Sequence, residues 1–149
     1  MKKEKMNSLK FSKQDIKLGI LLWFRITRFY NQNIKFTNQH LKKWNLSAAQ
    51  FDLLSNIGGN SQRITQQELA EKLVVTKGNI TQLLSKLENL DLIRRDREWK
   101  TNYISLTAKG KELYHDVVPE QQQFQAGQFS NLNLDEKKQL LLLLKKIQK

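Results

Sequence analysis

The run LAEKLVVTKGNITQLLSKLE, from Leu69 to Glu88, decides the fold of this chain. Just before it, Thr65 and Glu68 stand in the Thr-x-x-Glu pattern of a capping box, in which the two side chains satisfy helix-terminal N–H groups. Within the run, Thr76 stands where it would cap a second helix. The apolar residues of this second helix recur at i, i+3, i+4 and i+7 and are Ile80, Leu83, Leu84 and Leu87. The run therefore predicts two helices joined by a tight turn.

A short hairpin with a charged tip is predicted directly after the second helix. Leu92 and Ile93 begin an extended segment, and residues 102–106 alternate polar and apolar side chains with the period of two that a β-strand has. The basic residues between these two stretches are Arg94, Arg95, Arg97 and Lys100. Trp99 stands at the tip, where it would pack on the base of the hairpin, stack on a partner or touch the sugar edge of DNA; packing is the first expectation.

A long helical pattern precedes this centre. From Asp15 to about Trp44 the apolar residues occupy more than one helix face, so this segment is expected to contact more than one neighbour. Ser47 is then expected to cap a shorter helix that ends at Gly58-Gly59.

Two more helices are predicted after the hairpin. Thr107 opens a helix that runs towards Pro119 and beyond it. Asn133 and Glu136 form a second capping box, and the terminal helix behind it carries five consecutive leucines at residues 140–144.

Helix, tight turn, helix and charged hairpin, in this order, are the elements of a winged helix-turn-helix. We therefore predict a mainly α chain with a small β-hairpin wing, organised as a single unit over residues 1–149. Residues 47–106 are expected to form the winged helix-turn-helix DNA-binding region. Because one small winged domain cannot cover the apolar surface of the terminal helices, residues 14–46 and 107–148 are expected to form a helical dimerisation region.

In a winged helix-turn-helix the second helix enters the major groove and the wing reaches the adjacent minor groove. Gln and Asn side chains suit adenine edges, Thr offers a hydroxyl and a methyl group, and Lys suits guanine or phosphate. The residues expected on base edges or close to them are Gly78, Asn79, Thr81 and Gln82. Those expected to hold phosphate are Thr76, Lys77 and Lys86. An ordinary solvated helix face is the alternative, because polar residues are the default on a surface helix.

The wing is expected to reach DNA through its cations, because a basic cluster beside a reading helix suits phosphate or the minor groove. The residues concerned are Arg95, Arg97 and Lys100. Asp96 and Glu98 stand among them and would neutralise part of this charge. The alternative is an edge hairpin that its charges protect against aggregation.

The whole chain is strongly basic, with 26 Lys and Arg against 14 Asp and Glu and a formal charge of +12. Nucleic acid is therefore the leading partner, and the winged helix-turn-helix predicts that it is double-stranded DNA. Eleven of the basic residues fall in residues 1–46, where charge can also serve solubility or an anionic membrane surface. No apolar run approaches the ~20 residues of a membrane span, and the basic start is not followed by a cleavage site. We expect a cytoplasmic protein that does not enter the membrane.

Enzymatic chemistry finds little support in the sequence. Cysteine is absent, which excludes disulfides, thiolate metal sites and cysteine nucleophiles. His40 and His115 have no His, Asp or Glu neighbour at ligand spacing, and no phosphate loop or nucleophile elbow is present. We therefore expect no enzyme, no metal and no cofactor. The serious alternative to a regulator is a winged-helix module that binds protein without specific DNA binding, which would need an apolar patch where this surface is polar and basic.

Residues 14 to 148 resemble the MarR family of bacterial winged-helix transcription regulators. The resemblance rests on residues 69–88, on the LIRR run at 92–95 and on ISLTAKG at 104–110, in which the Leu-Thr-x-Lys-Gly pattern is the most specific part. The chain departs from the family near the wing tip, where it has Glu98-Trp99-Lys100 in place of the common Asp-x-Arg. In the family the acid orients this arginine for the minor groove, so the minor-groove contact falls here to Lys100. It also has Val74 where many members have glycine.

The resemblance implies an obligate homodimer whose first and last two helices form the interface. It further implies a palindromic operator, repression in most cases, and frequent release by a small aromatic or lipophilic ligand. Such a ligand would bind where the long first helix and the helix of Phe51 meet the DNA-binding module. The residues expected to line this cleft are Trp23, Tyr30, Trp44 and Phe51, for which plain core packing is the alternative.

Overall fold

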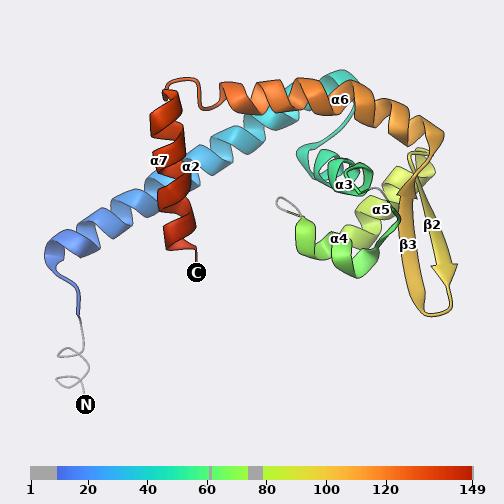
Figure 1. The fold of residues 1–149 in the computed structure, drawn as a ribbon, viewed down its shortest axis with the longest axis horizontal. Coiled ribbons are helices and arrows are strands. Elements are labelled where there is room, and N and C mark those ends of the chain that lie inside the picture. Colours follow the sequence, from blue (N-terminus) through green and yellow to red (C-terminus); the bar gives the residue numbers. More distant parts are fainter. Residues whose placement is uncertain (1–9, 61, 74–78, 149) are drawn as a thin grey trace, which may run out of the picture. The chain divides into compact units, whose positions relative to one another are not determined.

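The computed structural model describes residues 10–60, 62–73 and 79–148. It is mainly helical with one small antiparallel sheet, which confirms the predicted fold class (Figure 1). In chain order the elements are α2 (Lys13–Leu41), a 3-10 turn (Lys42–Trp44), α3 (Ala48–Gly58), β1 (Ile64–Thr65), α4 (Gln66–Lys72), α5 (Ile80–Asn89), β2 (Ile93–Glu98), β3 (Thr101–Leu106), α6 (Ala108–Gly127) and α7 (Leu134–Ile147).

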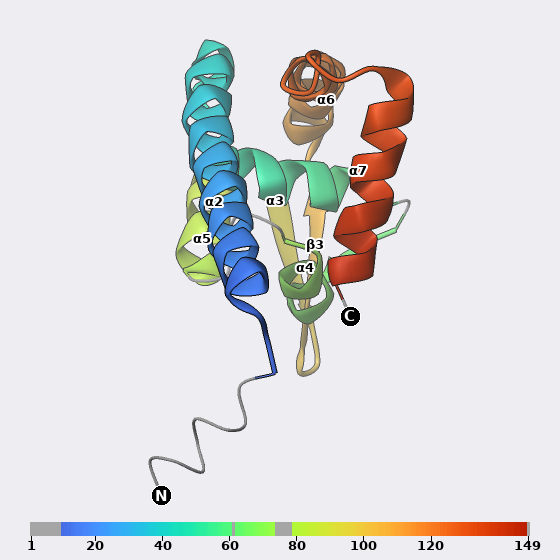
Figure 2. The ribbon, with the colours of Figure 1, turned by 90° about the vertical axis from the view of Figure 1, so that its left-hand side faces the viewer.

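The chain divides into two compact units, Met1–Lys35 and Phe36–Lys149. The described part of the first unit is most of α2, an unbroken helix (Figure 2). Its large apolar side chains are exposed, among them Trp23 at 70%. The helix begins at a cap that sequence analysis did not identify, because the Ser12 Oγ accepts the Asp15 N–H at 3.0 Å.

Helix caps account for where the helices of the second unit begin. The predicted caps Ser47, Thr65 and Asn133 each accept the N–H of the third helical residue, at 3.1, 3.1 and 2.8 Å respectively. Thr107 caps α6 in the same way, at 3.0 Å. All four starts are therefore confirmed.

The start of α5 differs from the prediction. The helix begins at Ile80, and its N-cap is Asn79 with a left-handed φ of 57° and no side-chain capping bond. Thr76, the expected cap, lies outside the described residues. Asparagine is one of the few residues that adopts this conformation readily, so the backbone turns into the helix there without the side-chain signal on which the prediction relied.

The sheet has the strand order β1-β3-β2, with both pairs antiparallel. The hairpin of β2 and β3 confirms the predicted wing, and Glu98 pairs with Thr101, which leaves Trp99 and Lys100 as a two-residue loop. The two-residue strand β1, in which Ile64 pairs with Ile104, was not predicted. The core packed between sheet and helices consists of Leu53, Ile57, Ile64, Leu69, Leu73, Leu84, Leu87, Leu92, Ile93 and Ile104.

A second, smaller core joins the end of α2 to α3 and α6. Its buried residues are Leu41, Leu46, Leu54 and Val117, and Trp44 and Phe51 pack against it half-buried. Beside it, His40 Nδ1 lies 2.8 Å from Gln121 Oε1, and its ring stacks on Phe124 at 4.3 Å. These contacts join the end of α2 to α6, which continues through Pro119 to Gly127.

Candidate nucleic-acid interface

Helix α5 separates an apolar face from a polar one, as its sequence predicts. Leu84 and Leu87 are fully buried in the core. The exposed residues of the helix are Thr81, Gln82, Lys86, Glu88 and Asn89, and the N-cap Asn79 is exposed as well. Four of the residues predicted to contact DNA or to stand close to it, Asn79, Thr81, Gln82 and Lys86, are therefore accessible, whereas three more, Thr76, Lys77 and Gly78, lie outside the described residues.

Helix α5 forms side-chain hydrogen bonds at its N-terminal end. Gln66 of α4 donates through Nε2 to Thr81 Oγ1 at 3.4 Å, and Ser85 Oγ donates to the Thr81 carbonyl at 3.0 Å. The first bond links the two helices of the helix-turn-helix at the end of α5 that carries the expected base contacts, and the second lies within α5.

Arg95 of β2 binds α5 across the sheet edge. Its Nη2 donates to Glu88 Oε1 at 3.0 Å and to Ser85 Oγ at 3.2 Å, and its Nε donates to Glu88 Oε2 at 3.3 Å. This two-pronged bond lowers the pKa of Glu88 below its ordinary value. The guanidinium, predicted as a DNA contact, thus has internal partners that hold the wing against the reading helix, and its contact with DNA stays a prediction.

Two further ion pairs neutralise the acidic residues of the wing. Arg94 Nη2 lies 3.5 Å from Asp96 Oδ2, and Arg63 Nη1 lies 2.7 Å from Glu98 Oε1. The Arg63–Glu98 hydrogen bond lowers the pKa of Glu98 and raises that of Arg63. Arg63 also lies over the Tyr103 ring at 4.2 Å. Sequence analysis missed Arg63, because the residue precedes a strand too short to show a periodic pattern.

The wing tip is cationic and carries an exposed tryptophan. Trp99 is 87% exposed, so the expectation that it packs on the hairpin base is wrong. Lys100 Nζ lies 5.2 Å from its ring centroid, and Arg97 Nε donates to the Trp99 carbonyl at 3.3 Å. Within the described part of the chain neither Arg97 nor Lys100 forms an ion pair. Their positive charge therefore stays available at the tip.

The Leu-Thr-x-Lys-Gly segment joins the wing to α6. Thr107 Oγ1 donates to the Asp91 carbonyl at 2.6 Å, and Lys109 Nζ donates to the Leu90 carbonyl at 3.0 Å. Gly110 lies so close to the backbone of Leu92 that a Cβ atom there would stand 1.9 Å from the Leu92 carbonyl oxygen. Each polar or small residue of this segment thus fixes the loop that follows α5 against the start of α6.

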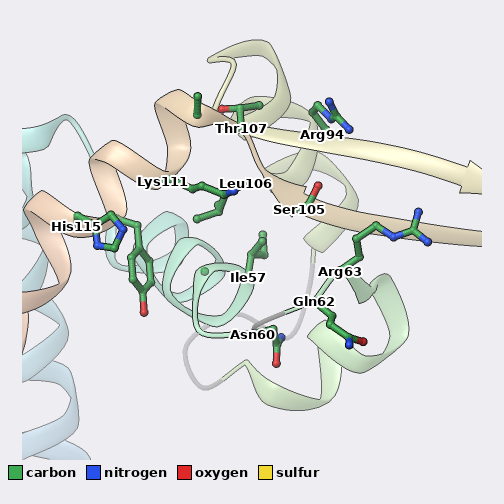
Figure 3. A pocket seen from close by; sticks show the side chains of 13 residues that line it. Ile57, Asn60, Gln62, Arg63, Arg94, Ser105, Leu106, Thr107, Lys111 and His115 are labelled. Carbon is green, nitrogen blue, oxygen red and sulfur yellow. The ribbon is translucent and has the colours of Figure 1, made fainter.

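A cavity of about 820 Å³ lies beside this junction, where the end of α3, the start of α6 and the ends of the strands meet (Figure 3). Its basic lining residues are Arg63, Arg94 and Lys111, and no acidic residue is among the described residues that line it. Sequence analysis did not predict this cavity. The predicted ligand residues lie elsewhere: Trp44 and Phe51 belong to the second core, whereas Trp23 and Tyr30 belong to the other unit.

Residues 10–60, 62–73 and 79–148 contain no group of three or more His, Asp or Glu side chains that could hold a metal ion. Within the same ranges no helix is long and apolar enough to cross a membrane.

Comparison with known proteins decides the family. The model of the MarR family matches residues 44–98, from the 3-10 turn to the end of β2. Over 137 residues, which are 91% of this chain and 92% of the relative, the sequence is 42% identical to an uncharacterised HTH-type transcriptional regulator of Bacillus cereus. The chain belongs to the MarR family. The prediction of a DNA-binding transcription regulator with a winged helix-turn-helix is thereby confirmed at the level of the family.

Solved structures share the fold of this MarR-family chain. A putative MarR-like transcription regulator from Bacillus cereus aligns with a TM-score of 0.80 at 18% identity, over 89% of this chain and 99% of that one. A mutant MarR from E. coli, complexed with operator DNA, aligns with a TM-score of 0.73 at 28% identity, over 91% of this chain and 96% of that one. The likeness extends over most of the chain, beyond the residues of the family model.

Proposed function

We propose that this chain is a repressor that binds a palindromic operator as a homodimer, with α5 in the major groove and the wing in the adjacent minor groove. The observation that carries the proposal is the exposed polar face of α5 beside a wing tip whose cations, Arg97 and Lys100, have no carboxylate partner among the described residues. Positive charge without an internal partner attracts phosphate, and amide side chains on an accessible helix read base edges.

The roles within this interface follow from exposure and chemistry. Gln82, Thr81 and Asn79 stand at the base edges, and Lys86 holds phosphate. Lys100 contacts the minor groove at the wing tip, and the neighbouring Arg97 adds positive charge beside it. Thr76, Lys77 and Gly78 keep their predicted roles, and Arg95 acts first by holding the wing to α5.

Dimerisation is proposed because apolar surface remains on the terminal helices. Trp23, Phe24 and Leu22 of α2 are more than half exposed, and so are Leu141 and Leu142 of α7. Clusters of this kind are covered in soluble proteins by a partner. We assign residues 14–46 and 107–148 to this dimerisation region and residues 47–106 to DNA. A folded monomer at micromolar concentration in analytical ultracentrifugation would contradict the assignment.

A small aromatic or lipophilic anion is proposed to release the dimer from DNA. Such a ligand acts only if it prefers a dimer in which the spacing of the reading helices no longer matches successive major grooves. Trp23, Tyr30, Trp44 and Phe51 remain the predicted site. A titration that follows tryptophan fluorescence and operator affinity together tests this proposal, and a ligand that binds without changing operator affinity would refute it.

The central experiment is selection of binding sites from a random duplex library, followed by affinity measurements on the selected duplex. Gln82→Ala should lose about 1–3 kcal/mol of discrimination against the wrong base at one position of each half-site. Lys100→Ala should weaken selected and random DNA alike and reduce the salt slope by about one. Gln123→Ala removes an exposed amide from α6, within the proposed dimerisation region, and is the matched control. Once analytical ultracentrifugation has shown that this variant is still a dimer, it should change neither the base discrimination nor the salt slope. Uniform loss across sequences in both test variants would refute the assignment of α5 as the reading helix.

A further inference from the structure

Trp99 combines two features that are unfavourable for a folded protein. It is the first residue of the two-residue loop between Glu98 and Thr101, and its φ is 56°. At 87% exposed, it is also the most exposed of the large apolar side chains that the structure describes.

Neither feature stabilises the hairpin. A positive φ at the first position of a tight hairpin loop is adopted readily by Gly, Asn and Asp, whereas a bulky side chain is strained there. An indole in water also forgoes the free energy that its burial would supply. In the described part of the chain the only ring partner of Trp99 is the Lys100 ammonium, 5.2 Å from the centroid. The hairpin alone therefore gives no reason for a tryptophan at this position.

The charges around the indole indicate what kind of surface would cover it. Arg97 and Lys100 flank it and form no ion pair with any residue that the structure describes, while the adjacent Glu98 is neutralised by Arg63 at 2.7 Å. Covering this tip with an apolar protein pocket would bury two charges without partners, which is costly. A polyanion with apolar walls avoids that cost. The minor groove of DNA is such a surface, because phosphates border it and deoxyribose forms its sides.

We propose that Trp99 is a DNA-contact residue that gives the wing a preference for A·T pairs. Its indole lies against deoxyribose in the minor groove, and its Nε1–H donates to adenine N3 or thymine O2, the acceptors of that groove. At a G·C pair the guanine N2 amino group, itself a donor, occupies the same place and opposes this bond. The inference rests on the proposed DNA binding and assigns part of the specificity to a residue outside α5.

The test uses the full-length protein and three versions of the duplex selected by wild type. They differ only at the base pairs beneath the wing, which are A·T, G·C or inosine·cytosine. Inosine lacks the guanine N2 amino group, so its pair presents A·T-like acceptors in the minor groove. Wild type should bind the A·T and inosine duplexes equally and the G·C duplex about tenfold more weakly, which corresponds to about 1.4 kcal/mol.

Two substitutions separate the indole contact from hairpin stability. Trp99→Asn should lower affinity for the A·T duplex about tenfold, yet raise the thermal midpoint by about 1–3 °C, because Asn suits the positive φ. Trp99→Phe keeps an apolar ring but lacks the N–H, so it should retain part of the affinity and lose the difference between A·T and G·C. Gln82→Ala, which affects the major groove, should keep that difference.

The outcomes are distinguishable. If wild type selects no duplex, the proposed function itself fails. If wild type binds and Trp99→Asn binds equally well, the indole does not contact DNA. If Trp99→Asn lowers the thermal midpoint by several degrees, the indole serves the fold. If Trp99→Phe keeps the full preference for A·T, the Nε1–H does not read the groove. Each of the last three results overturns the inference.

Discussion

Gly110 is a position where a single added methyl group should strongly destabilise the fold. It lies in the first turn of α6, and a Cβ placed there would stand 1.9 Å from the Leu92 carbonyl oxygen and 2.9 Å from its carbon, where real Cβ atoms do not come within 3.0 Å. Both contacts are with backbone, so no side-chain rotation relieves them. The same carbonyl accepts the Thr107 N–H at 3.1 Å, and a shift that accommodates the methyl group therefore disturbs that bond.

The size of the effect follows from opposing terms. Gly→Ala inside a helix contributes about 1 kcal/mol in favour of the folded state through helix propensity. Against it stand overpacking against backbone, about 3 kcal/mol or somewhat more, and a weakened hydrogen bond, about 1 kcal/mol. We expect Gly110→Ala to lower the free energy of unfolding by about 2–4 kcal/mol. Because the clash lies between the wing and α6, operator affinity should fall with it.

Urea unfolding followed by circular dichroism measures this change, with Gly127→Ala as the matched control. Gly127 lies at the other end of the same helix, and a Cβ there meets nothing within 4 Å. The control should be neutral or stabilise the protein by about 0.5 kcal/mol. A Gly110→Ala variant as stable as Gly127→Ala would show that the close approach to Leu92 does not exist, and the account given above of the Leu-Thr-x-Lys-Gly segment would be wrong.

Three further predictions concern ion pairing and caps. Arg95 lowers the pKa of Glu88 below 4.5, so their ion pair stabilises the folded state above that pH and is lost as the pH falls through the lowered pKa. Urea midpoints measured from neutral pH to about pH 3 should therefore decline less in Glu88→Gln than in wild type. Thr107→Val removes both the cap of α6 and the 2.6 Å bond to the Asp91 carbonyl, and should lower the free energy of unfolding by about 1–2 kcal/mol. Thr107→Ser keeps the hydroxyl and should therefore retain most of the wild-type stability. Asn133→Ala should lower stability by about 1 kcal/mol, and unchanged thermal midpoints would mean that α7 does not unfold with the rest.

Local signals explain the parts of the fold that sequence alone could predict. The caps at Ser47, Thr65 and Asn133 act within one helical turn, so the residues that make the bond are also close in sequence. The buried face of α5 follows from leucines at helical spacing, since a helix next to a core must turn that face inward. The polar face of the reading helix was predictable for the same reason.

The features that could not be predicted from the sequence depend on contacts between elements or on backbone conformation. Strand β1 has two residues, too few for a period, and it exists because Ile64 pairs with Ile104 about forty positions later. The bond between Arg95 and Glu88 joins a strand to a helix, and the sequence does not show which acidic residue a given arginine will bind. Asn79 begins α5 through its backbone conformation, which no side-chain pattern records.

The ion pairs change how the basic character of this chain should be understood. The sequence predicts four wing cations, Arg94, Arg95, Arg97 and Lys100. The first two are bound to carboxylates, whereas the last two have no carboxylate partner within the described ranges. A cation released from an internal pair gains little from a phosphate, because it exchanges one anion for another, whereas an unpaired cation gains the whole attraction and displaces a counterion. In the proposed complex we therefore expect the affinity of the wing for DNA to depend on Arg97 and Lys100 at its tip, while Arg94 and Arg95, nearer its base, set where that tip lies.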